Sequence, residues 1–237
     1  MYKCFFSLLL SFYAVFGVAQ KQEPPQEGSQ GNKPKQTMAD SESFKPKPDW
    51  TPHELKVGFN AIRSGRTAFG AGITTHEIQA GLAMHQAIAV LDLGIEENIR
   101  GQSFDYVNKG RYFRVGADWN LVKDLESGNV MSLGLRYARA GFEDNLAYSR
   151  DMGFGEENYQ FANSSLNARW FEVTFNLRGK IVSNLYMGFT LRWQTIRKIN
   201  GEGELKAFDI PGFGKTRREN STAFDYYFMW RLPLKKK

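Results

Sequence analysis

The feature that most constrains this chain is a series of stretches in which apolar residues alternate with polar or small ones at period two. Such alternation predicts strands, because successive side chains of a strand point to opposite faces of a sheet. Each stretch is about ten residues long, the length that a tilted strand needs to cross a lipid bilayer and more than a usual globular strand. The predicted strands are Glu54–Arg63, Thr75–Met84, Ala87–Glu96, Arg111–Leu121, Val130–Ala140, Ala168–Arg178, Leu185–Thr195 and Ala223–Leu232.

The segments between the predicted strands alternate between long and short. The long ones are 64–74, 97–110, 141–167 and 196–222, and the short ones are 85–86, 122–129 and 179–184. Outer-membrane barrels show this asymmetry, with long loops outside the cell and tight turns in the periplasm. An even number of strands then places both chain ends in the periplasm. The sequence therefore predicts an all-β fold, an eight-stranded antiparallel up-and-down transmembrane β-barrel.

The hydropathy of the chain fits this prediction and argues against a helical membrane protein. Aromatic residues make up 14% of the chain, yet its mean hydropathy of -0.46 is that of a water-soluble protein. A membrane helix needs about 20 consecutive apolar residues, and no such stretch follows the start of the chain. In a membrane barrel only every second strand residue faces lipid, so the mean hydropathy stays modest.

The start of the chain has the form of a signal peptide. A basic beginning with Lys3 precedes an apolar run from Phe5 to Val18, and small residues stand before an expected cut after Ala19. An uncleaved membrane anchor is the alternative, although the apolar run is too short to span a bilayer comfortably. The lone cysteine, Cys4, precedes the apolar run, so it is no lipoprotein acylation site and leaves with the signal.

Three regions follow from these patterns. We predict a signal peptide over residues 1–19, a disordered periplasmic tether over residues 20–49 and a β-barrel domain over residues 50–237. The tether is rich in Gln, Pro, Lys, Glu, Ser and Gly, so it cannot bury enough apolar surface to offset the entropy lost on ordering.

If the apolar set of each strand faces lipid, the opposite set fills the barrel, because eight strands leave just enough room for side chains to close the interior. That opposite set holds as many acids as bases, and charges removed from water need partners. We therefore expect an interior charge network and no open pore. Its expected members are Lys56, Glu77, Asp92, Glu96, Arg114, Asp118, Arg136, Glu172, Arg178, Arg192, Asp225 and Arg231.

A soluble lipocalin-like barrel is the rival architecture, because it has the same strand number but turns its apolar set inward around a ligand. Strand parity alone does not separate the two. Aromatic placement favours the membrane barrel, since aromatic residues of the apolar set stand mostly towards strand ends, as in interfacial girdles. These residues are Trp119, Tyr137, Trp193, Phe224, Tyr226 and Trp230.

Several motifs between Trp50 and the C-terminus resemble those of one family. They are Trp50-Thr-Pro-His-Glu-Leu, Ile62-Arg-Ser-Gly-Arg-Thr, Leu135-Arg-Tyr-Ala-Arg, Ala168-Arg-Trp-Phe-Glu, Gly201-Glu-Gly-Glu-Leu, Asp209-Ile-Pro-Gly-Phe-Gly and Trp230-Arg-Leu-Pro-Leu-Lys. On these motifs the chain resembles an outer-membrane β-barrel family of Bacteroidetes-type bacteria, the domain of unknown function 6048. The resemblance implies an outer-membrane barrel and no known activity, so it adds no functional residues.

Two apparent sites do not indicate chemistry. Gly214-Lys215-Thr216 imitates the end of a phosphate-binding loop, but Asp209 stands where that motif needs its first glycine, and no helix pattern follows. The histidines His53, His76 and His85 lack metal-ligand spacing.

His76 alone invites a catalytic interpretation. It stands on the lipid-facing parity near the predicted outer rim, where a lipid-modifying hydrolase could hold its base, with Ser and Glu residues on neighbouring strands. No serine nucleophile motif accompanies it, so we interpret it as an interfacial polar residue. We therefore expect no catalytic residue, no cofactor and no metal.

The formal net charge is +6, and half of it comes from Lys235–Lys237. The arginines are spread singly through the predicted strands, so the charge does not indicate nucleic-acid binding. We expect a monomer whose partners are outer-membrane lipid and an unidentified envelope protein. The expected function is that of a non-enzymatic outer-membrane barrel that acts structurally or binds a partner through its loops or tail. The alternatives are a lipid-modifying barrel enzyme and a soluble lipocalin-like ligand-binding barrel.

Overall fold

The computed structural model describes residues 50–69, 72–101, 104–122, 128–151, 153 and 155–234. All of them belong to the compact unit Lys47–Lys237. The predicted signal peptide, the predicted tether and Lys235–Lys237 lie outside the described residues.

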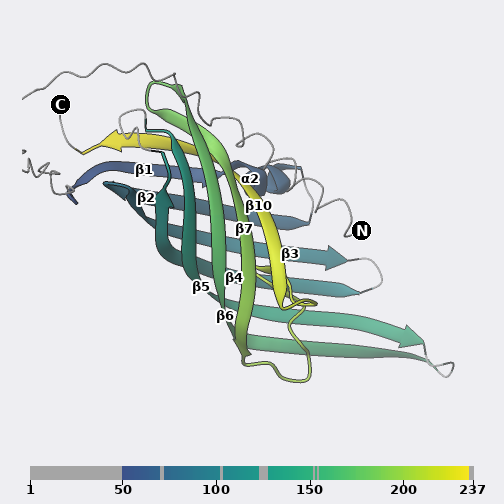
Figure 1. Ribbon diagram of the computed structural model, residues 1–237. Coiled ribbons are helices and arrows are strands. Elements are labelled where there is room, and N and C mark those ends of the chain that lie inside the picture. Colours follow the sequence, from purple (N-terminus) through teal and green to yellow (C-terminus); the bar gives the residue numbers. More distant parts are fainter. Residues whose placement is uncertain are drawn as a thin grey trace, which may run out of the picture. The chain divides into compact units, whose positions relative to one another are not determined.

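Antiparallel strands close into a barrel (Figure 1), and this confirms the predicted eight-stranded all-β fold for the described part of the chain. Around the barrel the strands follow the order β1-β10-β7-β6-β5-β4-β3-β2. A second small sheet pairs β8 with β9. The strands are β1 (Pro52–Asn60), β2 (Ile73–Met84), β3 (Ala87–Gly101), β4 (Asp105–Asn120), β5 (Val130–Asp151), β6 (Glu156–Val182), β7 (Leu185–Asn200), β8 (Asp209–Ile210), β9 (Gly214–Lys215) and β10 (Asn220–Pro233). Within the described ranges, no helix is both long and apolar enough to cross a membrane.

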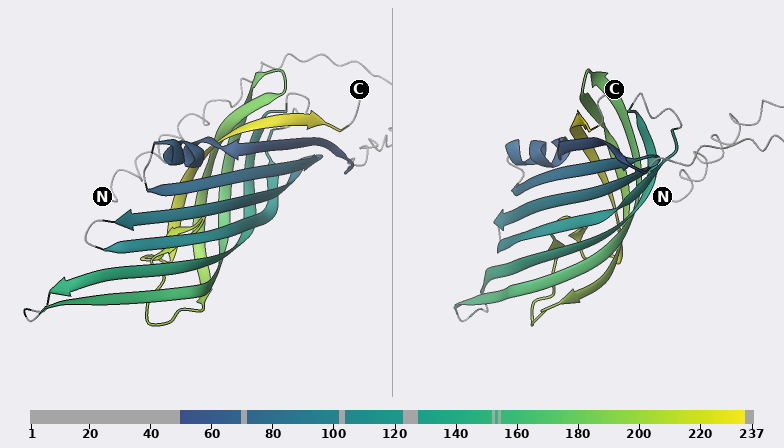
Figure 2. Two further views of the ribbon diagram at one scale, coloured as in Figure 1. Left: turned by 180° about the vertical axis from the view of Figure 1, so that it is seen from behind. Right: turned by 90° about the vertical axis from the view of Figure 1, so that its left-hand side faces the viewer.

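Two of the predicted long connections are wrong, because residues 97–110 and 141–167 are mostly strand. Pairing of β3 with β4 continues to Gly101 and Asp105, and pairing of β5 with β6 continues to Asp151 and Glu156. The 22-residue β5 and the 27-residue β6 project beyond their neighbours in Figures 1 and 2. These extensions have polar side chains on both faces, so backbone pairing holds them together without the apolar alternation that sequence reasoning requires.

The first predicted strand ends early, at Asn60, and the short helix α2 (Ala61–Ala68) follows it. Asn60 caps the helix, because its side-chain oxygen accepts a hydrogen bond from the backbone N–H of Arg63 at 3.1 Å. The prediction of a strand up to Arg63 is therefore wrong for its last three residues, which are helical. The helix lies at the end of the barrel towards which β5 and β6 extend (Figure 2), and it directs Arg63 towards the interior charges.

The two faces of the strands are those that the alternation predicts. Apolar side chains such as Ile78, Leu135 and Val173 point outward, with Leu135 69% exposed. Charged side chains such as Glu77 and Arg114 are buried inside the barrel. A lipocalin-like barrel requires the opposite arrangement, so this alternative is excluded by the burial of the two faces.

The connection between β7 and β10 folds back into the mouth of the barrel. Ile210 and Phe213 are buried in an apolar cluster with Tyr112, Leu166 and Trp170, and the rings of Phe213 and Trp170 meet edge to face with centroids 5.8 Å apart. Gly212 allows this approach. Its φ is +82°, and a Cβ there would lie 2.7 Å from the Tyr112 ring. The connection is thus a plug for the mouth, and its side chains continue the core of the barrel.

Candidate functional site

The centre of the barrel is a network of carboxylates and guanidinium groups. Glu77 on β2 accepts a hydrogen bond from Arg114 on β4 at 2.8 Å and from the hydroxyls of Tyr112 and Tyr227. Asp225 on β10 accepts from Arg192 on β7 at 2.7 Å. Arg192 also donates to Asp92 on β3, the strand opposite β7 in the barrel, at 3.2 Å, so the network connects the wall across its interior.

Glu172 on β6 has four hydrogen-bond donors around its carboxylate. It accepts hydrogen bonds from Arg114 at 2.9 Å, from Arg192 at 2.8 Å, from the indole N–H of Trp170 at 2.7 Å and from Gln194 at 2.8 Å. Arg114, Trp170 and Gln194 all donate to Oε1, and Arg192 donates to Oε2, so both carboxylate oxygens are hydrogen-bonded. The arrangement compensates the large cost of removing this charge from water.

A second group of charges lies towards the short-turn end. Arg136 on β5 donates to Asp92 at 2.7 Å and to Asp118 at 3.0 Å. Arg178 on β6 donates to Gln79 and lies 5.5 Å from the centre of the Tyr227 ring. Among the described residues Arg178 has no ion pair, so equal numbers of acids and bases in the interior set do not give every charge a charged partner.

The short-turn rim holds the remaining predicted members. Lys56 on β1 pairs with Glu54 at 2.7 Å and donates to the backbone oxygen of Gly128 at 2.6 Å. Arg231 on β10 also pairs with Glu54. Glu54 is buried and serves both cations, although it was not among the predicted interior residues.

All twelve residues of the predicted interior set point into the barrel, and ten of them are buried while Glu96 and Arg231 are half-buried. The structure adds partners that the sequence did not single out, namely Glu54, Asn60, Arg63, Tyr112 and Trp170. Tyr112 and Trp170 stand on the inward parity, so the alternation could have identified them. Arg63 reaches the network only because α2 folds over the mouth, and the β7–β10 connection contributes the carbonyl oxygen of Gly212, which accepts from Arg114 at 2.8 Å.

The mouth itself contains a polar pocket of about 360 Å³ between α2 and the plug. Arg63 enters it and pairs with Asp225 at 2.9 Å and with Glu96 at 3.5 Å. Asp209 of the plug accepts from Asn98 at 2.9 Å and from Arg100 at 3.2 Å. Burial raises the pKa of Asp209 to about 6, and the nearby carboxylate of Glu96 acts in the same direction, while Arg100 opposes the rise.

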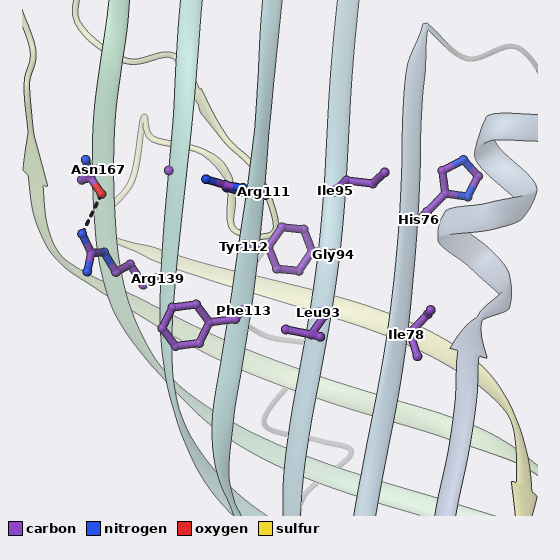
Figure 3. A pocket seen from close by; sticks show the side chains of 11 residues that line it. His76, Ile78, Leu93, Gly94, Ile95, Arg111, Tyr112, Phe113, Arg139 and Asn167 are labelled. Atoms are coloured by element: carbon purple, nitrogen blue, oxygen red, sulfur yellow. Dashed lines mark hydrogen bonds between the residues drawn. The ribbon is translucent and has the colours of Figure 1, made fainter.

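A groove of about 630 Å³ runs along the outer face of the barrel (Figure 3). His76, Ile95, Arg111 and Asn167 border it at one level, and Ile78, Leu93, Phe113 and Arg139 border it at the next. The residues that line the groove include no Ser, Asp or Glu. His76 therefore has neither a nucleophile to activate nor a carboxylate to orient it within this groove.

The structure gives no support for a phosphate-binding loop at Gly214–Thr216 or for a histidine site at His85. Gly214 and Lys215 form the two-residue strand β9, where a phosphate-binding loop requires the start of a helix. His85 lies in the turn between β2 and β3 and contacts Trp50, with ring centroids 5.9 Å apart. Within the described ranges, no group of three or more His, Cys, Asp or Glu side chains could hold a metal ion.

Comparison with known proteins places the chain in a family. No curated protein matches the sequence. Among solved structures, the fold is similar to Neisserial surface protein A (NspA), with a TM-score of 0.41 and 12% sequence identity over 77% of this chain and 95% of that chain. This likeness is loose and concerns the backbone alone. The family model of the domain of unknown function DUF6048 matches residues 1–237, and the chain belongs to that family.

Proposed function

We propose that this protein is an outer-membrane β-barrel without enzymatic activity, which serves the cell envelope by binding a partner at its exposed end. One observation supports the membrane location above all others. Every strand of the barrel exposes a large apolar side chain on the outer face, and together they form a continuous apolar belt. The belt comprises Phe59, Ile78, Leu93, Val115, Leu135, Val173, Leu191 and Phe224.

Exposing an apolar surface that encircles a protein to water is energetically unfavourable. Soluble monomers rarely expose contiguous apolar patches larger than a few hundred Å². A bilayer removes this surface from water, while the closed hydrogen-bonded sheet leaves no unpaired strand edge in lipid. Trp119, Trp193 and Trp230 are each about half-exposed on the outer face, as expected of aromatic residues at membrane interfaces.

The interior supports a role other than transport. Large side chains such as Trp170, Arg114 and Arg192 are fully buried in it, and the plug fills the mouth above them. Side chains therefore close the lumen of the barrel, which leaves no open channel among the described residues. The groove at His76 lacks a nucleophile and a carboxylate among its lining residues, which supports the non-enzymatic interpretation.

The extended strands offer the surface at which a partner would bind. Tyr148 on β5 stacks on Tyr159 of β6, with ring centroids 5.2 Å apart, and Phe161 lies 6.3 Å from Tyr148. A pocket of about 300 Å³ lies beside these rings, and Phe104, which is 46% exposed, lines it. The three clustered rings are half-buried, and aromatic residues are enriched at protein interfaces.

Fractionation of cells that express the full chain tests the membrane location. We expect the protein in the outer membrane, with a gel mobility that changes when the sample is boiled, because a closed barrel resists detergent. Recovery in the soluble periplasm would refute the proposal.

The enzyme alternative has a separate test in the lipids of the cell. We expect the lipid A and phospholipid profiles to be the same with the intact gene and with His76→Ala. If deletion of the gene changes these profiles and the His76→Ala gene does not restore them, the protein is a lipid-modifying enzyme.

Crosslinking from position 148, with a probe at position 215 as the control, tests the partner surface.

A further inference from the structure

We propose that the outer face of strands β4–β7 binds a phosphorylated lipid of the external leaflet, with its phosphate on a cluster of basic side chains and its acyl chains in the grooves beneath. This inference rests on the proposed membrane location. The basic cluster comprises Arg111, Arg139, Arg169, Arg197 and Lys198, all of which are exposed on the outer face.

Strand register brings three of these cations into a single row. Arg139 on β5 lies directly opposite Arg169 on β6, and Arg169 lies directly opposite Lys198 on β7. Side chains at opposed positions have Cβ atoms about 5 Å apart, and like charges there are destabilising. Three adjacent cations without an anion between them therefore repel one another and destabilise the barrel. A bound anion would turn this repulsion into attraction between each cation and the anion.

An irregularity in β7 adds a fourth charge to the row. The pairing of β6 with β7 shifts between Arg169 and Trp170, because Lys198 pairs with Arg169 while Ile196 pairs with Trp170. The extra residue, Arg197, is exposed like Lys198 beside it, and its guanidinium lies 5.8 Å from the centre of the Phe171 ring. Bulges of this kind re-aim side chains and are common next to functional sites.

The protein itself supplies little neutralisation for this cluster. None of its five cations forms an ion pair with another described residue, in contrast to Lys109, which pairs with Glu97 at 2.8 Å. The Arg139 guanidinium donates one hydrogen bond, to the neutral side chain of Asn167 at 3.0 Å. The remaining donors are free to bind a phosphate, which arginine recognises with two parallel hydrogen bonds.

The surface next to the cluster is suited to acyl chains. Phe113 lies directly opposite Arg139, and Tyr137 and Phe171 lie two residues further along their strands on the same face. The three rings form a chain of contacts, with centroids 6.5 and 5.6 Å apart. Two apolar grooves flank these rings. The groove of about 630 Å³ includes Ile78, Leu93 and Phe113, and a second of about 390 Å³ includes Leu135, Val173 and Trp193.

The position of the cluster along the barrel fits a lipid headgroup. It lies between the apolar belt and the extended parts of β5 and β6, on the side of the plug and α2. In the proposed orientation this level is the outer membrane interface, where lipid phosphates reside. Neutral lipid would fit the grooves but would leave the cations unpaired, so charge complementarity favours a phosphorylated lipid.

The test uses the full barrel in detergent micelles and native mass spectrometry to measure lipid retention. The probe is phosphatidic acid, with diacylglycerol as its counterpart that lacks the phosphate. The triple variant Arg139→Gln/Arg169→Gln/Lys198→Gln removes the row. The matched control Arg66→Gln/Arg150→Gln/Lys180→Gln removes three exposed cations on α2, at the tip of β5 and at the far end of β6.

We expect the wild-type barrel to bind phosphatidic acid at least ten times more tightly than diacylglycerol. The triple variant should lose at least ten-fold in affinity for phosphatidic acid, and the control should stay within two-fold. Equal retention of phosphatidic acid by the triple variant and the control would overturn the inference. Displacement of the lipid by millimolar inorganic phosphate would assign the cluster to free phosphate and would also overturn it.

Two further measurements separate this inference from the proposed function and from misfolding. The boiling-dependent gel shift of each variant reports whether the barrel closes, and if the triple variant fails to close, the single variant Arg169→Gln should still lose about three-fold or more in affinity. Failure of the wild-type barrel to insert into lipid vesicles refutes the membrane proposal. Normal insertion without preference for phosphatidic acid refutes the lipid site alone.

Discussion

At the scale of single residues, Glu172 illustrates the cost of a buried charge network. Its four donors include Arg114 and Arg192, which have no access to water. Glu172→Ala leaves these buried cations short of a partner, so we expect the free energy of unfolding to fall by about 3 to 5 kcal/mol. Urea unfolding of the barrel in lipid vesicles measures the change.

The control for this prediction is Glu156→Ala, an exposed glutamate of the same strand, which should leave the unfolding midpoint nearly unchanged. A compensating removal of Arg192 should restore little stability, because Arg192 also pairs with Asp92 and Asp225. A harmless Glu172→Ala would mean that the network does not stabilise the barrel.

Val173, the neighbour of Glu172, tests the opposite face. It is 45% exposed in the outward belt, and we expect it near the middle of the bilayer. Val173→Arg should cost about 2 to 4 kcal/mol in folding into lipid, while Val173→Leu should be nearly neutral. A spin label at position 173 provides a second measurement, and access of a water-soluble quencher without contact with lipid would contradict the membrane assignment.

At the scale of elements, the plug between β7 and β10 responds to pH through Asp209. Its pKa is raised from 3.8 to about 6, so the docked plug binds more protons than the released plug between these values. Docking is therefore strongest below about pH 4 and weakens as pH rises through 6, by about 3 kcal/mol over the whole window. Hydrogen exchange of the plug amides, corrected for the intrinsic effect of pH, should show protection that falls from pH 5 to pH 7.

Asp209→Asn is the matched variant for this prediction. It keeps an oxygen that can accept from Asn98 and Arg100 but carries no titrating charge. We expect the protection of the plug in this variant to be independent of pH over the same range. A pH dependence that survives the substitution would contradict the assignment to Asp209.

At the scale of the whole molecule, the filled interior predicts that the barrel does not conduct ions. Fully buried side chains of Trp170, Arg136 and Tyr227 occupy the lumen, and Gly212 of the plug accepts a hydrogen bond from Arg114 at 2.8 Å above them. Purified protein in planar bilayers should give no single-channel currents at neutral pH. Stable conductance steps from barrels whose insertion is verified would show that the plug or the network opens.

The sequence predicts the barrel well but the ends of its strands poorly. Alternation locates every barrel strand, because an apolar outer face and a charged interior impose period two wherever the strand has different surroundings on its two faces. Beyond the belt, as at Asn145 and Asn158, both faces meet water, and the pattern that marks a strand disappears although the pairing continues. At Asn60 the strand gives way to α2 through a cap, which the apolar pattern up to Arg63 concealed.

The sequence by itself determined which side chains enter the barrel, because the two-residue period fixes the face of each side chain whatever the register. Only the tertiary structure decided which charges meet. Arg136 and Glu172 are direct neighbours in the pairing of β5 with β6, yet Arg136 binds Asp92 and Asp118 while Glu172 binds Arg114 and Arg192. Closure of the sheet brings distant strands within reach across a narrow lumen, and the plug and α2 add charges from the mouth. These contacts depend on the register and curvature of the whole barrel, which no local stretch of sequence encodes.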